Sequence, residues 1–498
     1  MVRSVSPVSD APPAPAAPTP VLLIDAETKQ KPRNLDLLAD WQYVERSIHR
    51  LLAAWGREVP AWDDKGALHR HVWHQAECVR RLRARIGEFI GGKPDAPVSA
   101  RLERLANTVL RAPSLEDALD GIYEFLLKTL VGAYGEYIAT VHPVHDLPTI
   151  ALLHEINQIK SQQWLWYRDY RRRRPHRTAA AYRAQVEAAL ADCGSFRAPL
   201  SVERGGEARP AGVATDFRLR RFSARDVPNR AQHPFMDYVR ADFRTNLETR
   251  RLFWAYGYML EKNLPDDQLR WLYDGHAMPW DWQHDISRHL WDESRHGDSG
   301  YSRLRDFGIT LAEVGFSGYD QAERDATLKD ISAARGLPLD DCYARHDELL
   351  APLRAEPLTP AQLYENAFMI GLVAETGHFV VKNEGYLDFK EGQDLASAEM
   401  MLFDIIDETA HVTYAHKWLP LLAERAGLDN SGYRERATKI REESQVRADA
   451  LAEDFLRALP RGDRDPGHAF YQDLLARIRA VAPLANATTC PPRSPKPM

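Results

Sequence analysis

A five-residue phrase that occurs twice, Asp292-Glu293-Ser294-Arg295-His296 and Asp407-Glu408-Thr409-Ala410-His411, is the strongest constraint on how this 498-residue chain can fold. The two copies differ at only two of five positions, and their glutamates lie 115 residues apart. In a helix, residues three apart lie on one face, so each phrase can direct a carboxylate and an imidazole to the same side. Two such helices facing each other would bring two half-sites together.

The residue types of the phrases indicate a metal site. Carboxylates and neutral imidazoles form the mixed oxygen and nitrogen shell that suits iron or manganese. Glutamates buried together without metal could not all remain ionised. Asp292 and Asp407 fit the outer carboxylate that accepts a hydrogen bond from a ligating histidine and fixes its tautomer. The alternative is a solvated helix face with unrelated polar residues, because single Glu-x-x-His matches arise by chance.

The paired phrases resemble those of the ferritin-like superfamily of carboxylate-bridged dimetal proteins, over about residues 235–426. The resemblance implies a four-helix bundle in which Glu293, His296, Glu408 and His411 are ligands. It also implies that each half supplies one more glutamate from its preceding helix. The implied cofactor is two iron ions, with manganese or a mixed manganese and iron pair as alternatives.

The position of the turn selects the glutamate of the first half. Two residues of an antiparallel helix hairpin face each other when they are equally far from the turn. Glu293 lies 14 residues after Pro279, and a similar count back from Asn263 reaches Glu248. Glu248 also shares a helix face with apolar residues. We therefore predict Glu248 as a ligand, with Glu261 as the alternative.

The same reasoning applies to the second half. Glu408 lies 14 residues after Asp394, and Glu375 lies 33 residues before Glu408, which fits a hairpin whose first helix runs well into the 380s. We predict Glu375 as a ligand, with Glu365 as the alternative if that helix ends earlier. His378 departs from the usual pattern, and an extra ligand, an outer hydrogen-bonding residue and a core histidine remain alternatives for it.

Two further polar residues share the ligand faces. His289 precedes Glu293 by about one turn, and Asp404 precedes Glu408 by about one turn. Lone polar residues beside a site are usually hydrogen-bonding neighbours, so we predict that both support the ligands from outside the metal shell.

Two stretches outside the phrases suggest rival sites. His142-Pro143-Val144-His145 could nucleate a mononuclear metal site, but its proline breaks helical spacing and it has no second copy. Residues 164–174 mix aromatic and basic side chains, a composition that can stack on bases or bind acidic groups. We interpret that stretch as an amphipathic helix with packed aromatics and solvated arginines.

Apolar residues at spacings of three and four, with cap and stop signals, predict an all-α chain. The predicted parts are a disordered Pro/Ala-rich leader (1–34), an N-terminal helical region (35–230), a ferritin-like core (231–430), a C-terminal helical extension (431–483) and a disordered tail (484–498). Within the core we expect one helix over 235–263, a short segment over 266–274, a helix after Pro279, a connection over 297–358 with one or two short helices, a helix from 361 into the 380s, and a helix over 394–426.

Composition argues against several protein classes. The formal net charge of -6 argues against a nucleic-acid partner. No apolar run approaches the roughly 20 residues of a membrane span, and the N-terminus lacks the apolar segment of a secretory signal. The cysteines show no paired spacing and suit a reducing cytoplasm: Cys78, Cys193, Cys342 and Cys490. We therefore expect a cytoplasmic protein without membrane partners.

These observations and the resemblance together predict a non-haem dimetal oxidoreductase, a di-iron oxygenase or oxidase. It would activate O2 to oxidise a small organic substrate, with electrons from a separate donor. The prediction is compatible with a homodimer. The rival function is that of a non-catalytic ferritin-like protein that binds metal, stores iron or serves in interactions. The large helical region outside the core favours the enzyme, because a storage shell needs only a compact bundle.

Overall fold

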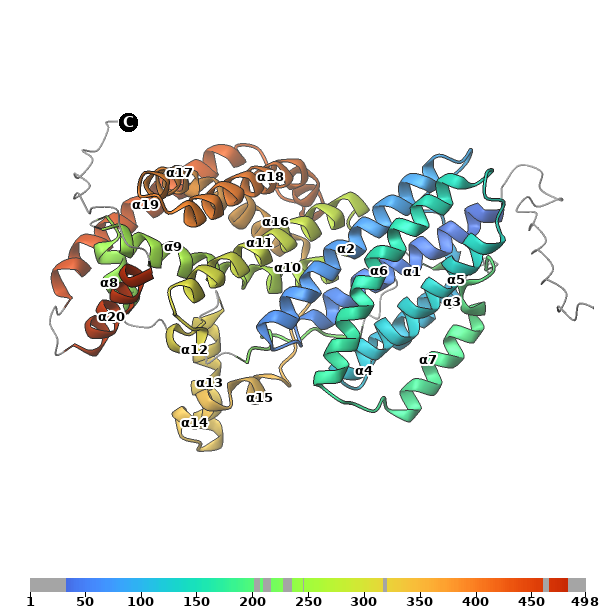
Figure 1. Ribbon diagram of the computed structural model, residues 1–498, viewed down its shortest axis with the longest axis horizontal. Helices are drawn as coiled ribbons and strands as arrows, with labels where there is room; N and C mark the ends of the chain where they lie inside the picture. The colour runs from blue at the N-terminus through green and yellow to red at the C-terminus, as the bar shows by residue number, and fades with distance from the viewer. Residues whose placement is uncertain are drawn as a thin grey trace, which may run out of the picture.

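The structure is a computed structural model that describes residues 33–200, 207–208, 216–226, 235–244, 246–316, 320–459 and 465–481. These residues form helices, apart from the short strands β1 (Val98–Ser99) and β2 (Glu207–Ala208), which pair antiparallel (Figure 1). The all-α class predicted from the sequence is confirmed. The predicted tail and almost all of the predicted leader lie outside the described residues.

The N-terminal region is a group of packed helices, drawn from blue to green at one end of Figure 1. Ser114 caps α4 as its sequence indicates, because its side chain accepts a hydrogen bond from the Asp117 backbone N–H. The elements are α1 (Arg33–Gly56), α2 (Trp62–Gly87), α3 (Ala100–Leu110), α4 (Leu115–Leu119), the π-helix η1 (Asp120–Leu127), α5 (Lys128–Thr140), α6 (Leu147–Arg173), α7 (Ala180–Asp192) and the 3-10 turn η2 (Gly194–Phe196).

The rest of the chain supplies the helices that carry the Asp-Glu-x-x-His phrases. These elements are α8 (Phe235–Asp242), α9 (Leu247–Glu261), α10 (Leu264–Asp274), α11 (Trp280–Asp306), α12 (Leu311–Val314), α13 (Gln321–Arg335), α14 (Leu339–Ala344), α15 (His346–Leu350), α16 (Pro360–Phe368), the π-helix η3 (Met369–Ala374), α17 (Glu375–Glu391), α18 (Leu395–Ala426), α19 (Tyr433–Ala458) and α20 (Pro466–Val481).

Two predictions of helix extent are wrong. The single helix expected over 235–263 is divided into α8 and α9, because the Asn246 side chain accepts a hydrogen bond from the Thr249 backbone N–H and starts a new helix there. The connection expected over 297–358 begins ten residues later than predicted, since α11 continues to Asp306, and its described residues (307–316 and 320–358) form four helices rather than one or two.

The first hairpin consists of α9 and α10 packed against α11. A Cβ on Gly300 would lie 2.3 Å from the Met259 backbone nitrogen, and one on Gly297 would lie 2.8 Å from the Lys262 Cβ. One on Gly275 would lie 2.6 Å from the Trp282 ring. α11 therefore runs antiparallel to α9 and α10, and the turn of the hairpin lies between Gly275 and the start of α11. The glycines let the helices approach this closely.

The second hairpin consists of α16, η3 and α17 packed against α18. Two predicted signals are confirmed in α18: the Asp394 side chain caps its first turn by accepting from the Ser397 N–H, and Gly427 ends it with φ 65°. The π-helix η3 ends immediately before Glu375, and such bulges are frequent at functional sites. The two hairpins meet through contacts of α18 with α11 and of α17 with α9.

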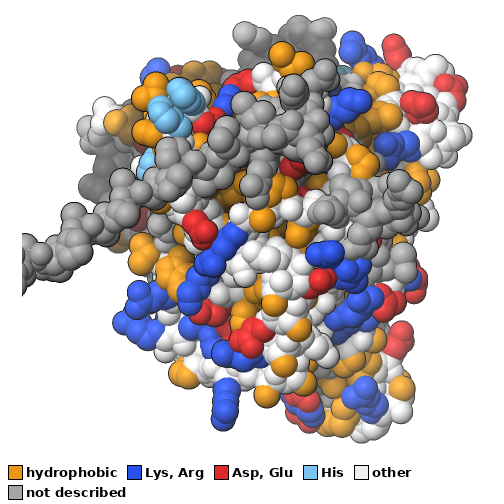
Figure 2. Space-filling model, turned by 90° about the vertical axis from the view of Figure 1, so that its right-hand side faces the viewer, with side chains coloured by type: hydrophobic (Ala, Val, Ile, Leu, Met, Phe, Trp, Pro, Cys, Tyr) orange, Lys and Arg blue, Asp and Glu red, His pale blue; other side chains and the backbone are white. Residues whose placement is uncertain are grey.

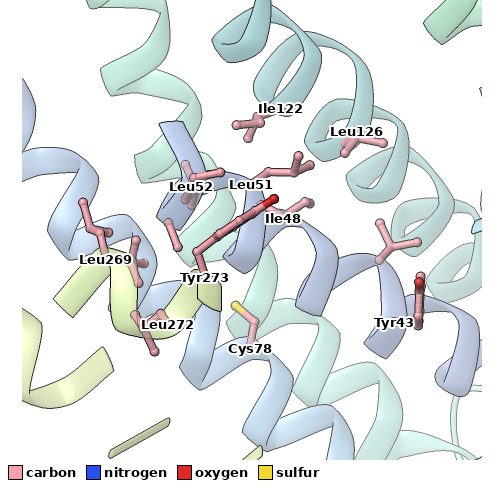
Figure 3. Close-up of a cluster of buried hydrophobic side chains, with 14 of the residues drawn as sticks. Tyr43, Ile48, Leu51, Leu52, Cys78, Ile122, Leu126, Leu269, Leu272 and Tyr273 are labelled. Carbon is pink, nitrogen blue, oxygen red and sulfur yellow. The ribbon is translucent and has the colours of Figure 1, made fainter. Parts of the chain in front are cut away.

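One apolar core crosses the predicted boundary near residue 230. Figure 3 shows Leu269, Leu272 and Tyr273 of α10 beside Leu51 and Leu52 of α1, with side chains from α2 and η1 around them. Burying each such leucine contributes about 2 kcal/mol. The N-terminal helices therefore anchor α10 and, through α10, the start of α11.

Basic and acidic side chains are interspersed on the face of the N-terminal helices that Figure 2 shows. In the aromatic and basic stretch of α6, Tyr167 and Tyr170 are buried, as expected. Its arginines are paired with acids: Arg171 with Asp120, and Arg173 with Asp64 and Asp169. No helix of the described residues is long and apolar enough to cross a membrane.

A buried ion pair joins α2 to α10 and leads to a stability prediction. Lys65 Nζ lies 2.9 Å from both carboxylate oxygens of Asp266, and both residues are buried. Asp266→Ala would leave the Lys65 ammonium buried without its counter-ion, so we expect a loss of about 3 kcal/mol. Calorimetry would show this as a lower melting temperature. The matched control is Asp267→Ala, because the Asp267 side chain is half exposed and its loss should cost under about 1 kcal/mol.

Candidate metal centre

The two phrases lie on the facing helices α11 and α18. Glu293 and His296 on α11, and Glu408 and His411 on α18, are all buried, with 4% exposure or less. Because the residues of each phrase are three apart, both carboxylates and both imidazoles point into the space between the hairpins. Their ligand atoms form two overlapping groups, which we name after the histidine in each.

The His411 subsite has four ligand atoms that all lie within 4.8 Å of one another. His289 Nε2 is 3.2 Å from Glu293 Oε1 and 3.2 Å from Glu375 Oε1. His411 Nδ1 is 3.4 Å from Glu293 Oε1 and 3.7 Å from Glu375 Oε1. The subsite consists of His289, Glu293, Glu375 and His411.

The His296 subsite lies beside it. His296 Nδ1 is 3.3 Å from Glu261 Oε2, 3.3 Å from Asp404 Oδ1 and 3.8 Å from Glu293 Oε2. Glu408 belongs to the same group, and its Oε2 also lies 3.6 Å from His411 Nδ1. Glu293 and Glu408 therefore contact both subsites. The subsite combines two triads of close ligand atoms that share His296, one completed by Glu261 and Glu293 and the other by Asp404 and Glu408.

The structure corrects the choice of glutamate on α9. Glu248 lies in the first turn of α9, where its Oε1 is 3.6 Å from Arg479 Nε of α20. Glu261, the alternative, is the residue beside Glu293 and His296. The two positions are 13 residues apart, which is about 20 Å along a helix, so they cannot serve one site.

Other predicted residues are placed as follows. Glu375 lies in the His411 subsite, whereas Glu365 and His378 have exposed side chains outside both subsites. His289 and Asp404, predicted as outer neighbours, lie inside the subsites with atoms as close as those of the predicted ligands. His289 and Asp404 are therefore candidate metal ligands and not only neighbours of the ligands.

The two aspartates of the phrases cross over. Asp407 Oδ2 lies 3.2 Å from His296 Nε2, and Asp292 Oδ2 lies 3.4 Å from His411 Nε2. Each aspartate therefore contacts the histidine of the other phrase. An Nε2–H that donates to a carboxylate leaves Nδ1 as the unprotonated nitrogen, and in both histidines Nδ1 faces the subsites.

Two arginines hold these aspartates in place. Arg295 donates to Asp292 and, at 2.7 Å, to Asp407. Arg288 Nε donates to Asp292 at 2.7 Å, and its other end reaches Asp407 at 3.4 Å. Burial opposes ionisation of Asp292, but His411 and the arginines outweigh it and hold the pKa of that carboxyl below its usual range.

Sequence reasoning missed two residues of the site. Lys382 on α17 is buried, with its Nζ 2.7 Å from Glu408 Oε1 and 2.8 Å from Asp404 Oδ2. The Tyr258 hydroxyl on α9 donates to Asp404 Oδ2 at 2.8 Å. Helical spacing gives a signal for both, because Lys382 is seven residues after Glu375 and Tyr258 is three residues before Glu261.

Four buried ligand atoms lack a hydrogen-bond partner among the described residues: Glu261 Oε2, His296 Nδ1, Glu408 Oε2 and His411 Nδ1. They face one another as two acid–imidazole pairs without hydrogen-bond geometry, Glu261 Oε2 with His296 Nδ1 at 3.3 Å and Glu408 Oε2 with His411 Nδ1 at 3.6 Å. All four are oxygen or imidazole nitrogen atoms directed at the two subsites, so the donor set fits divalent iron or manganese.

Burial and neighbouring charges shift the pKa values of several groups in the site. Burial raises the pKa of Glu261 to about 8, and burial also raises the pKa of Asp404. For His296, burial opposes the charged form, but Asp404 and the other acids around it raise its pKa well above the usual value. For His411, Asp292 and two glutamates outweigh burial in the same way.

The rival histidine pair of the N-terminal region does not belong to any group of three or more close ligand atoms among the described residues. His142 and His145 stack near the surface, with ring centroids 3.8 Å apart.

Comparison of the chain with protein-family models, with curated proteins and with solved structures gives no match in any of the three. The interpretation of the site therefore depends on its own residues.

Proposed function

We propose that the protein is a non-haem dimetal oxidoreductase that uses O2 to oxidise a small organic substrate. In this proposal α9, α11, α17 and α18 are the four helices of a ferritin-like bundle, and two iron ions, or a pair containing manganese, occupy the two subsites. The observation that carries the proposal is the convergence of acids and histidines from both hairpins on one buried space, where four of their ligand atoms make no hydrogen bond to the described residues.

Charge balance supports a pair of cations. The two subsites contain five carboxylates, those of Glu261, Glu293, Glu375, Asp404 and Glu408. Two divalent ions and the Lys382 ammonium would balance all five while the imidazoles remain neutral. One ion would leave two negative charges uncompensated in a buried space, which is costly.

The chain's own groups would set up the reaction. Glu293 and Glu408 contact both subsites and would hold the ions as a pair. Asp292 and Asp407 would keep the proton of each imidazole on Nε2. When bound, a pair of reduced iron ions supplies electrons to O2 and so provides the oxidising power. The burial of the ligands excludes competing water.

Metal analysis of the purified protein tests the proposal, and the two glutamates of α9 offer a matched pair of variants. We expect about two iron or manganese ions per chain. Glu261→Ala should weaken metal binding by more than the roughly 10–100-fold that loss of an outer partner costs. Glu248→Ala should leave it unchanged, because Glu248 faces Arg479 at the other end of the helix.

Three results would count against the proposal. Protein without metal after growth and reconstitution with iron or manganese would exclude a dimetal enzyme. Many irons per chain, in a cage-sized assembly, would indicate storage. Equal metal content in the Glu261→Ala and Glu248→Ala variants would show that metal binds elsewhere.

A further inference from the structure

Lys382 brings a positive charge into one of the two subsites. Its Nζ lies 2.7 Å from Glu408 Oε1, 3.0 Å from Asp404 Oδ1 and 2.8 Å from Asp404 Oδ2, and the residue is only 2% exposed. Asp404 and Glu408 both belong to the His296 subsite. Asp404 Oδ1, which also lies 3.3 Å from His296 Nδ1, is therefore an oxygen that the ammonium and an ion in this subsite would compete for.

Among the described residues, no lysine or arginine pairs with Glu293 or Glu375 of the His411 subsite. Its acids, Glu293 and Glu375, are approached by the imidazoles of His289 and His411, which can give up a proton and become neutral ligands. A lysine cannot take that role while it carries its proton, because an ammonium has three donors and no acceptor. The two subsites thus differ in what a metal ion must displace.

The groups around Lys382 come from two neighbouring helices, α18 and α9. Asp404 and Glu408 on α18 pair with it directly, Glu261 on α9 lies close enough to favour its charge, and Tyr258 contributes its ring at 5.5 Å. Every acidic neighbour stabilises the ammonium in the absence of metal. Lys382 is therefore the counter-ion that allows these acids to lie together in the metal-free protein.

We propose that Lys382 makes the two subsites unequal, so that a first divalent ion fills the His411 subsite tightly and a second fills the His296 subsite only by taking Asp404 Oδ1 from the Lys382 ammonium, which stays beside Glu408 Oε1. This inference rests on the proposed dimetal function and adds an order of loading to it.

A titration of metal-free protein with Mn²⁺, followed by calorimetry and by the free Mn²⁺ signal in electron paramagnetic resonance, tests the inference. Wild-type protein should bind in two separate steps. In Lys382→Met the second step should tighten by roughly 10- to 100-fold, because a competing buried charge is gone, while the first changes little. Lys390→Met is the matched control, since Lys390 lies on the same helix with an exposed side chain.

Thermal unfolding gives a second measurement that does not depend on activity. Metal-free Lys382→Met should melt at a lower temperature than metal-free wild type, and two Mn²⁺ per chain should remove that difference. Lys382→Gln serves in the same way if the methionine variant does not fold, because its amide keeps a hydrogen bond without the charge.

The outcomes separate the two proposals. Two equal binding steps in wild type, unchanged in Lys382→Met and Lys382→Gln, would overturn the inference and leave the dimetal site standing. Absence of Mn²⁺ and Fe²⁺ binding in wild type and in both variants would overturn the dimetal function and the inference together. A second step that tightens in the Lys382 variants but not in Lys390→Met would support the inference.

Discussion

Glu293→Ala is expected to abolish binding of both metal ions. Glu293 Oε1 lies 3.2 Å from His289 Nε2 and 3.4 Å from His411 Nδ1, while its Oε2 faces His296 Nδ1 at 3.8 Å. It is therefore shared by both subsites, and no other carboxylate on α11 takes its place, because Asp292 is held by arginines. Elemental analysis after reconstitution should find less than a tenth of the wild-type metal.

The fold should survive this substitution. The close packing of α11 against α9 runs through Gly297 and Gly300 and does not involve the Glu293 side chain. The circular dichroism spectrum of Glu293→Ala should therefore remain that of a helical protein, although the variant loses its metal. Glu365→Ala is the control, because that glutamate is exposed on α16 and should bind metal as wild type does. Wild-type metal content in Glu293→Ala would refute the assignment of the centre.

Much of the site follows from the sequence because helix periodicity is local. The spacing of three within each phrase places Glu293 with His296, and Glu408 with His411, on one face whatever the tertiary structure. The helix signals were equally local, and the Asp394 cap and the Gly427 stop both occur where they were predicted. What periodicity alone does not provide is the alignment of one helix with the next.

The error at Glu248 shows this limit. The count from the sequence ends the hairpin arm at Asn263, but Asn263 only precedes α10, which continues the arm to Gly275. Fourteen residues back from Gly275 is Glu261, as Glu293 is fourteen residues after Pro279. The same answer follows from comparing the halves, since Glu261 precedes Glu293 by 32 residues and Glu375 precedes Glu408 by 33.

Other features of the site require the packed structure. Asp292 contacts His411 and Asp407 contacts His296, an arrangement that depends on how α11 and α18 are rotated relative to each other. The sequence does not reveal it, because each aspartate is nearer in sequence to the histidine of its own phrase. Lys382 is on a predictable face, but its partners are on α18. The support of α10 by the N-terminal helices likewise comes from contacts distant in sequence.

The contacts of Asp292 with His411 and of Asp407 with His296 predict a second large effect, in which each aspartate variant weakens metal binding at one subsite only. Asp407→Asn removes the charge behind His296, and Asp292→Asn removes the charge behind His411. Loss of such an outer carboxylate typically costs 10–100-fold in metal affinity. Asp407→Asn should therefore weaken the His296 subsite, and Asp292→Asn should weaken the His411 subsite, although each aspartate belongs to the phrase of the other histidine.

A two-step Mn²⁺ titration distinguishes the crossed arrangement from an uncrossed one. With the His411 subsite filling first, Asp292→Asn should shift the tight step and Asp407→Asn the weak step, each by roughly 10–100-fold. Asp306→Asn, an exposed aspartate near the end of α11, should shift neither. The reverse assignment would mean that each aspartate orients the histidine of its own phrase. Equal shifts of both steps would mean that Arg288 and Arg295 couple the two aspartates, because each arginine contacts both.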